Sequence, residues 1–225
     1  MPKVSQLFSD SDRTRINEAV GRAEAQTSAE IVPVVAASSG RYDRPEDVVG
    51  LWFAAGFFTA AWYFLPAATM QPGHWGGISA AAQLSVFIVA IVMGFFVGAW
   101  AAMQVDWLRR LFTPKAQMRD EVAGRARQVF FDGRVHHTAA ASGLLIYVSL
   151  FEHMAEVFGD RSVVEKLGQE GLDDLCSQLR ARLRAGSPAD ALVHVLDAAG
   201  ERLGAVLTRA ADGRNELPDA LVVIE

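Results

Sequence analysis

The order of apolar and polar residues divides the chain into segments with helix or strand periodicity and one block without any charged residue. Residues 9–26 predict a helix, with Ser9 or Ser11 as its N-cap and acidic residues in its first turn. The apolar face of this helix consists of Ile16, Ala19, Val20 and Ala23. Residues 29–36, AEIVPVVA, predict a strand. Pro33 predicts that this strand lies at a sheet edge or a bulge, because proline cannot donate a ladder hydrogen bond.

The second half of the chain has the same mixture of helix and strand patterns. Residues 115–131 predict a helix, and residues 143–150, GLLIYVSL, predict a strand that is buried on both faces. The HMAEVFGD segment that follows predicts a hairpin partner for this strand. Two more helices are predicted over residues 171–185 and 188–209, the second of them capped by Ser187.

Residues 48–105 contain no Asp, Glu, Lys or Arg. Two apolar runs lie in this block, at residues 48–65 and 84–105, and the first extends to Met70 if Pro66 is included. About 20 apolar residues are needed for a helix to cross a hydrocarbon core of about 30 Å. A pair of buried helices in a soluble protein is the alternative. The complete lack of charge favours a transmembrane hairpin, so the lipid bilayer is the first expected partner.

Basic residues flank the hairpin on both sides but are missing from its connecting loop. Arg41 and Arg44 precede the first span, and Arg109, Arg110 and Lys115 follow the second. The positive-inside rule then predicts a two-span protein of the inner or plasma membrane, with both termini and the soluble domain in the cytoplasm. Tryptophans near the ends of both runs are typical of the aromatic belts at the two membrane interfaces.

Small residues recur at every fourth position of the second span: Ala90, Gly94, Gly98 and Ala102. Such spacing allows two helix backbones to approach closely. The stripe therefore predicts helix packing, either against the first span of the same chain or against a second copy in a homodimer.

The two polar segments, residues 1–47 and 106–225, flank the hairpin at residues 48–105. One helix and one strand cannot build a hydrophobic core, and two spans return the chain to the side of the membrane that it left. We therefore expect one α/β domain that is interrupted by the hairpin, with residues 29–36 in the same sheet as residues 143–150.

Composition excludes several other classes of function. The net charge of −5 provides no basic field, so no nucleic-acid partner is expected. The single cysteine, Cys176, cannot form an intramolecular disulfide, and its spacing from neighbouring leucines predicts a packing residue. The N-terminus has no apolar segment typical of a cleavable signal peptide. The sequence contains no P-loop, dinucleotide fingerprint or nucleophile elbow.

Two adjacent histidines, His136 and His137, precede the central strand. Neighbouring positions diverge on a regular element. No third histidine lies nearby, because His153 is at the far end of the strand and His74 is in the loop of the transmembrane hairpin. We expect the pair to form loop hydrogen bonds rather than a zinc site.

Four segments together resemble the TPM domain family, in its bacterial branch with transmembrane segments: SAEIVPVV, HHTAAASGLLIYVSLFEHMAEVFGD, GSPADAL and NELPD. The resemblance covers about residues 9–47 and 113–221. Its most specific part is the strand motif with Glu152, Gly159 and Asp160. It implies a three-layer α/β/α sandwich around a small mixed sheet. Known members of the family include a phosphatase, photosystem assembly factors and a receptor subunit, and several of them bind calcium.

The chain departs from the family pattern at one position that matters for chemistry. Relatives that bind calcium place an acidic-Asn-Gly turn before the central strand, and here residues 141–143 read Ala-Ser-Gly. Calcium takes six to eight oxygen ligands, usually with several carboxylates. The nearby acidic residues are Glu152, Glu156 and Asp160, of which Glu152 and Asp160 are the candidate metal ligands. No catalytic residue is assigned, and the phosphatase activity is not carried over.

Two functions of different class are expected from these observations. The first is a non-enzymatic, membrane-anchored interaction module without a cofactor, which assists the assembly or stability of complexes with an unidentified membrane protein. The alternative is a calcium-dependent phosphatase, or a calcium-binding domain, held at the membrane. The alternative needs a cluster of carboxylates at the strand ends, for which the candidates are Glu152, Asp160, Glu216 and Asp219.

Overall fold

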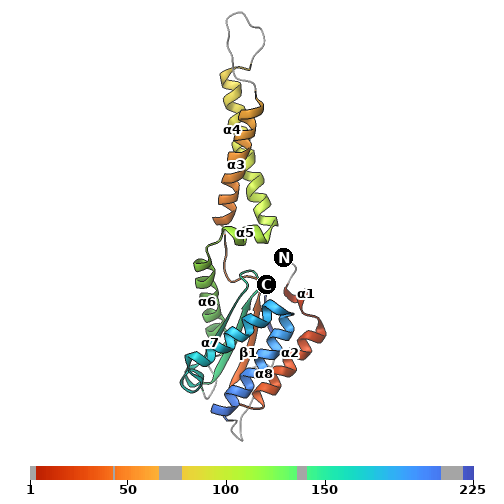
Figure 1. Cartoon of the computed structure of the whole chain (residues 1–225), viewed down its shortest axis with the longest axis vertical. Helices are drawn as coiled ribbons and strands as arrows, with labels where there is room; N and C mark the ends of the chain where they lie inside the picture. Colours follow the sequence, from red (N-terminus) through yellow and green to blue (C-terminus); the bar gives the residue numbers. More distant parts are fainter. Residues whose placement is uncertain (1–3, 43, 66–77, 136–140, 209–219) are drawn as a thin grey trace, which may run out of the picture. The chain divides into compact units, whose positions relative to one another are not determined.

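The computed structural model describes residues 4–42, 44–65, 78–135, 141–208 and 220–225. The chain forms two compact units. The first combines Met1–Gly40 with Lys115–Glu225, and the second is Arg41–Pro114. Figure 1 shows both units.

Within the described residues, the first unit contains one four-stranded sheet in the order β3-β2-β1-β4. Its strands are β1 (Glu30–Ala36), β2 (Gly143–Ser149), β3 (Met154–Gly159) and β4 (Val222–Ile224). β1 pairs in parallel with β2 and β4, whereas β2 and β3 form an antiparallel hairpin. The predicted small mixed sheet is therefore confirmed, and so is the hairpin partner of the central strand.

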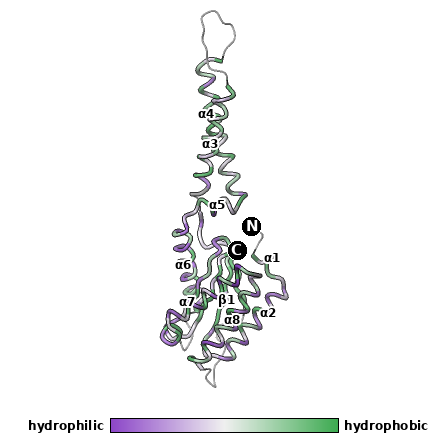
Figure 2. Tube along the Cα trace, in the orientation of Figure 1, coloured by the Kyte–Doolittle hydropathy of each residue, from purple (hydrophilic) through white to green (hydrophobic). Residues whose placement is uncertain are grey.

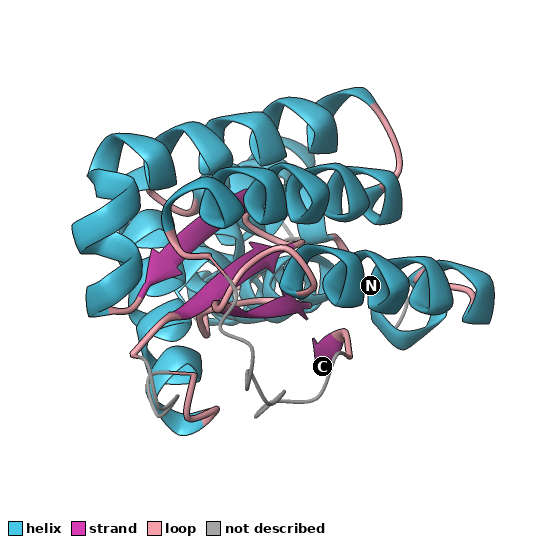
Figure 3. Cartoon of the chain, turned by 90° about the horizontal axis from the view of Figure 1, so that it is seen from below, coloured by secondary structure: helices cyan, strands magenta, loops and turns pink. Residues whose placement is uncertain are grey.

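Helices cover both faces of this sheet, as Figure 3 shows with the strands in magenta. The helices are α1 (Val4–Leu7), α2 (Asp10–Glu24), α6 (Lys115–Asp132), α7 (Arg161–Ala185) and α8 (Pro188–Val206). One apolar cluster joins α1, α2, α7 and α8 to one face of the sheet. A second, smaller cluster joins α6 to the other face. These layers confirm the α/β/α sandwich.

β2 is the centre of the core because all seven of its residues are buried. Alternate side chains of a strand point to opposite faces. Ile146 accordingly belongs to the cluster with α2, α7 and α8, whereas Leu145 and Tyr147 belong to the cluster with α6. A strand with apolar residues on both faces needs a helix layer on each side.

The edge position expected from Pro33 is wrong, because β1 lies between β2 and β4. The physical reason is the short length of β4, which pairs only with Val34–Ala36. The Ala37 N–H bonds to the Ile224 carbonyl of β4, and strand alternation turns the nitrogen of Pro33 toward the same side. Pro33 therefore precedes the β4 ladder, and its missing donor removes no hydrogen bond from that ladder.

In the first unit, side-chain caps fix the starts of three of the described helices. Ser9 caps α2 in a capping box with Asp12, which decides between the two serines considered above. Ser187 caps α8 before Pro188, as predicted. Asp160 caps α7, which begins ten residues before the expected start and is interrupted at Gly168. Gly168 has a φ of 75°, a conformation that glycine adopts without steric cost.

The second unit contains the two apolar helices, α3 (Arg44–Phe64) and α4 (Ala80–Gln104), followed by the short helix α5 (Asp106–Phe112). Both α3 and α4 are long and apolar enough to cross a membrane. Hydrophobic residues, green in Figure 2, run along both helices, and bulky ones such as Trp52, Phe96 and Trp100 are exposed. In water this surface would remain uncovered, whereas a lipid environment matches it.

Small residues allow α3 and α4 to pack closely. A Cβ atom at Gly94 would lie 2.8 Å from the Phe53 carbonyl oxygen, and one at Gly98 would lie 2.7 Å from the Phe53 Cβ. Ala102 is buried, whereas Ala90 is only half-buried. The stripe of small residues on α4 thus faces α3 of the same chain.

A comparison of two helical glycines tests the packing of α2 against α8. A Cβ atom at Gly200 in α8 would lie 2.6 Å from the Ala23 Cα of α2, whereas one at Gly124 in α6 would have nothing within 4 Å. We expect Gly200→Ala to lower the free energy of unfolding by about 1–3 kcal/mol, because the helices must separate. Gly124→Ala should raise it by about 1 kcal/mol through helix propensity. Chemical unfolding in detergent measures both, and equal effects would contradict the close contact.

Candidate functional site

Glu152 lies in the turn between β2 and β3 and is 3% exposed. Its Oε1 accepts a hydrogen bond from the Ser39 N–H at 2.9 Å, and its Oε2 accepts a short one from the Ser149 hydroxyl. Ser38 and Ser39 follow β1, so the carboxylate links the end of β1 to the end of β2. A buried carboxylate needs such donors, because burial of an ion without them is costly.

The hydroxyl groups around Glu152 form a chain of hydrogen bonds, in which each hydroxyl donates to the next group toward the carboxylate. The Ser39 hydroxyl donates to Ser149 Oγ at 2.9 Å and also lies 2.9 Å from the Tyr147 hydroxyl. Each hydroxyl has only one hydrogen. Since Ser149 donates to Glu152 and Ser39 donates to Ser149, Tyr147 must donate to Ser39. Burial raises the pKa of Tyr147, which keeps the phenol in its donor form.

This network has a structural use that competes with metal binding. Both oxygens of Glu152 accept hydrogen bonds from the chain itself. A calcium ion at this carboxylate would compete with these donors for the same two oxygens, and any donor that it displaced would be left buried without an acceptor. The geometry therefore favours a carboxylate that holds the segment after β1 against the sheet.

Asp160, the second candidate ligand, lies at the opposite end of β3. Its N–H donates to the Gly143 carbonyl at 2.7 Å, and its Oδ1 accepts from the Arg161 N–H at 2.7 Å. The other carboxylate oxygen, Oδ2, is buried and has no hydrogen bond within the described residues. Asp160 is therefore the N-cap of α7 and presents one buried oxygen without a partner.

The structure does not bring Glu152 and Asp160 together. The six residues of β3 separate them, which corresponds to about 20 Å at the rise of an extended strand. One cation cannot contact both carboxylates across that distance. The backbone carbonyls near Asp160 already accept hydrogen bonds: that of Ala141 from the Ser162 N–H, and that of Gly143 from the Asp160 N–H. Within the described residues, no group of three His, Cys, Asp or Glu side chains is placed to hold a metal ion, and neither Glu152 nor Asp160 stands in a cluster of carboxylates of the kind that calcium usually takes.

Several residues considered from the sequence lie outside the described residues: His74, His136, His137, Glu216 and Asp219. His153 is described, and it has a positive φ of 53° in the turn after β2. Glu156 lies on β3, where partial burial raises the pKa of its carboxyl group.

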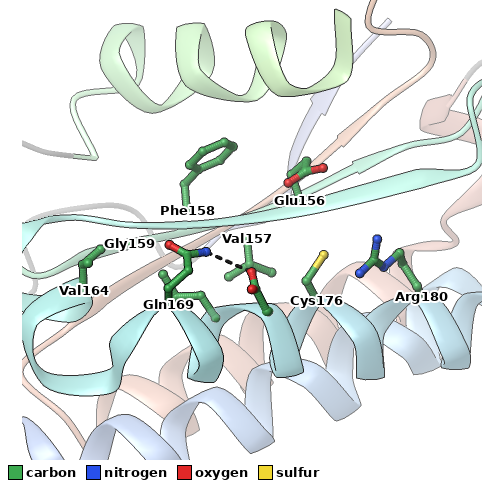
Figure 4. A pocket seen from close by; sticks show the side chains of 10 residues that line it. Glu156, Val157, Phe158, Gly159, Val164, Gln169, Cys176 and Arg180 are labelled. Atoms are coloured by element: carbon green, nitrogen blue, oxygen red, sulfur yellow. Dashed lines mark hydrogen bonds between the residues drawn. The ribbon is translucent and has the colours of Figure 1, made fainter. Parts of the chain in front are cut away.

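An open groove of about 450 Å³ runs between β3 and α7 (Figure 4). Figure 4 shows Glu156 and Phe158 on one side of the strand and Cys176 and Arg180 on the side of α7. Its wall contains both charged or amide side chains and apolar ones. Gln169 and Asp173 close part of it, because the Gln169 amide donates to the Asp173 carboxylate at 2.9 Å.

Cys176 occupies the α7 wall of this groove as a packing residue rather than a nucleophile. Its Sγ lies 3.0 Å from the Ala155 carbonyl oxygen, to which the thiol donates. Burial raises its pKa to about 11, so the thiolate is scarce at neutral pH. Since β3 is an edge strand of the described sheet, the thiol also covers one of its outward-facing carbonyls.

The hydroxyl network of Ser39, Tyr147 and Ser149 was not predicted from the sequence. A usable signal exists in the sequence, since Tyr147 and Ser149 are polar residues in a strand predicted to be buried on both faces. Buried polar groups require hydrogen-bond partners. Their partner Ser39 is distant in sequence, and only the parallel pairing of β1 with β2 brings the three side chains together.

The first prediction from this site concerns stability. Glu152→Ala leaves the Ser39 N–H and the Ser149 hydroxyl without acceptors and should lower the free energy of unfolding by about 1–3 kcal/mol for each buried group left unsatisfied. Glu152→Gln should cost less because its amide oxygen still accepts. The exposed Glu170 on α7 provides the control, and Glu170→Ala should stay within about 0.5 kcal/mol of the parent. A Glu152→Ala protein as stable as the control would refute the anchoring role.

The second prediction concerns calcium. A cation held by one carboxylate oxygen of Asp160 belongs to the weakest class of sites, with a Kd on the order of 10⁻⁴–10⁻³ M. Micromolar calcium should therefore leave the thermal unfolding midpoint unchanged, because only a ligand well above its Kd stabilises the folded state. Magnesium at equal ionic strength controls for salt. A rise in midpoint at micromolar calcium that disappears in Asp160→Asn would overturn this prediction.

No family model matches the chain, and it has no significant similarity to any curated protein. Among solved structures, it is similar to the NMR structure of the BA42 protein from the psychrophilic bacterium Bizionia argentinensis. The TM-score is 0.57 at 16% sequence identity, and the similarity covers 99% of this chain and 99% of the other. At this level of identity, the likeness shows a shared fold alone.

Proposed function

We propose that this chain is a membrane-anchored interaction module of the TPM type, which assists the assembly or stability of membrane protein complexes. The α/β unit would be held at the cytoplasmic face of an inner or plasma membrane by its two-span hairpin. Its partners would be membrane proteins of the same bilayer.

The observation that carries this proposal is the insertion of the apolar hairpin within a folded unit. Met1–Gly40 and Lys115–Glu225 form one compact unit, and the segment between them contains both apolar helices. A domain of this kind stays attached to its anchor at both ends of the insertion. Its partners are then restricted to molecules at or in the same membrane.

The TPM assignment is supported by the sequence resemblance together with the element order. The central strand motif becomes β2 and β3, followed by a helix that Asp160 caps. The shared fold of the BA42 protein is compatible with this assignment but carries no function.

The chemistry of the described residues favours interaction over catalysis. The enzyme alternative needs converging carboxylates, and Glu152 and Asp160 lie at opposite ends of β3. The oxygens of Glu152 already accept hydrogen bonds from Ser39 and Ser149. The cysteine in the groove is buried and has a raised pKa.

The small residues of α4 favour packing within one chain over homodimer formation. Gly94 and Gly98 both lie against Phe53 of α3. A second copy would have to use another face of the hairpin or displace α3. The homodimer therefore remains the less favoured form of the same proposal.

Exchange of the hairpin tests the proposal directly. The tagged full-length chain is purified from detergent-solubilised membranes, and the proteins bound to it are identified. In one variant, residues 41–114 are replaced by an unrelated two-span hairpin, and in another by a flexible polar linker. We expect the unrelated hairpin to retain the membrane partners, because the α/β unit recognises them, and the linker to lose them, because the unit leaves the membrane.

Two outcomes would count against the proposal. Recovery of the same partners with the polar linker would show that anchoring has no role in recognition. Hydrolysis of a phosphate ester by the purified chain, lost in Asp160→Asn, would move the enzyme alternative ahead.

A further inference from the structure

The short helix α5 follows α4 after a sharp change in backbone direction. Val105 separates the two helices with φ −124° and ψ 92°, an extended conformation that ends α4. α5 contacts both α3 and α4. Figure 1 shows α5 running across the base of the two long helices rather than continuing along them.

The base of the hairpin is also the boundary between apolar and charged sequence. Contacts of Gly98 with Gly50 and of Phe87 with Trp62 show that α3 and α4 are antiparallel. The first turn of α3, with Glu46 and Asp47, therefore lies at the same end as the last turn of α4. The charge-free block ends at Val105, and α5 begins at the next residue.

α5 exposes large apolar side chains although it has only seven residues. Trp107 is 68% exposed and Leu111 is 67% exposed, and their spacing of four residues puts them on one face. Phe112 adds a further exposed ring at the end of the helix. Arg110 lies one position before Leu111 and is half-buried. A tryptophan and a leucine beside an arginine are typical of helices at a lipid–water interface.

We propose that α5 lies in the plane of the lipid–water interface, with Trp107 and Leu111 inserted at the boundary between headgroups and acyl chains. The inference rests on the proposed membrane anchoring of α3 and α4. Its occupant is the phospholipid surface, because α5 begins where the membrane-spanning surface ends and contacts both spanning helices. The neighbouring Arg110 suits lipid phosphates.

An interfacial helix at this position would fix the depth of the hairpin. α4 is about 37 Å long at the helical rise, whereas the hydrocarbon core is about 30 Å thick. A helix longer than the core is free to tilt or to slide along the membrane normal. A second helix that lies flat and is joined through one residue, Val105, removes that freedom on the side of the soluble segments.

Depth-dependent fluorescence quenching tests the position of α5 in the full chain. The other four tryptophans, Trp52, Trp62, Trp75 and Trp100, are replaced by phenylalanine, so that Trp107 is the sole tryptophan. The protein is reconstituted into phosphatidylcholine and phosphatidylglycerol vesicles that carry a doxyl quencher either near the headgroup or at the end of the acyl chain. Quenching of Trp107 by the shallow label should exceed quenching by the deep label about twofold, since interfacial helices insert only about 5–10 Å.

A second tryptophan position separates this inference from the anchoring on which it rests. Met93 lies mid-way along α4 and is 55% exposed. In the same background with Trp107→Phe, Met93→Trp should be quenched more strongly by the deep label. If the deep label does not quench the Met93→Trp protein, the membrane anchoring itself fails. If that protein is quenched while Trp107 remains accessible to aqueous iodide and insensitive to both lipid labels, the interfacial position of α5 is overturned.

A charge placed on the same face gives a matched pair of variants. Leu111→Asp should reduce shallow quenching of Trp107 by about half, because burying a carboxylate at the boundary opposes insertion. Phe131→Asp on α6 adds the same charge at another exposed apolar residue and should leave the quenching unchanged. Equal quenching in the parent and in Leu111→Asp would contradict the insertion of this face.

Discussion

The parallel pairing of β1 with β2 is the interaction on which the rest of the structure depends. The register runs from Glu30 opposite Gly143 to Ala36 opposite Ser149, so every residue of the inner strand β1 faces one of the buried strand β2. Two parallel strands always need a crossover connection. In this chain the crossover contains the complete apolar hairpin as well as α6. The cost of closing such a connection grows only slowly with its length, and much of it is already helical.

The hydrogen-bond network around Glu152 strengthens this pairing at the point where the chain leaves the sheet. The Leu150 N–H donates to the Ala36 carbonyl at 3.0 Å, and the Phe151 N–H donates to the Ala37 carbonyl at 2.9 Å. Beyond these backbone bonds, Glu152 and Ser149 hold Ser39 through its N–H and its hydroxyl. Ser39 lies between the hairpin and β1 in the sequence. A pull on the chain from the hairpin would therefore act on the hydrogen bonds of Ser39 before it acted on the hydrogen bonds between β1 and β2. We therefore interpret the network as a structural one, which holds the residues after β1 against the end of β2, rather than as a catalytic centre.

The sequence predicted those features that depend on local periodicity. The two apolar helices α3 and α4, the buried strand β2 and the serine caps of α2 and α8 all follow from residues that are near one another in the chain. Features that depend on distant partners were not predictable in this way. Pro33 suggested an edge strand because a proline lacks a backbone donor. Whether that missing donor removes a ladder hydrogen bond depends on how far β4 extends along β1, which the local sequence does not reveal. The start of α7 was placed too late because Gly168 interrupts the helical pattern and hides the turns before it. The role of Glu152 required knowledge of Ser39, which belongs to the other side of the hairpin in sequence.

Close helix packing occurs in both units, and under the proposed membrane anchoring different forces would stabilise it in each. In the α/β unit, Gly200 lets α8 approach Ala23 of α2, and the burial of apolar surface from water drives the contact. In the hairpin, Gly94 lets α4 approach α3 in the same manner. In the proposed membrane setting, however, the surrounding lipid chains would be as apolar as the side chains of the two helices. Helix association in lipid therefore relies on dispersion contacts and close fit. The contact between α3 and α4 is the more exchangeable of the two, since another membrane helix can offer an equivalent surface. Under the proposed function, a membrane partner of the α/β unit would therefore have a second point of contact with this protein, the small-residue face of α4, for which it would compete with α3.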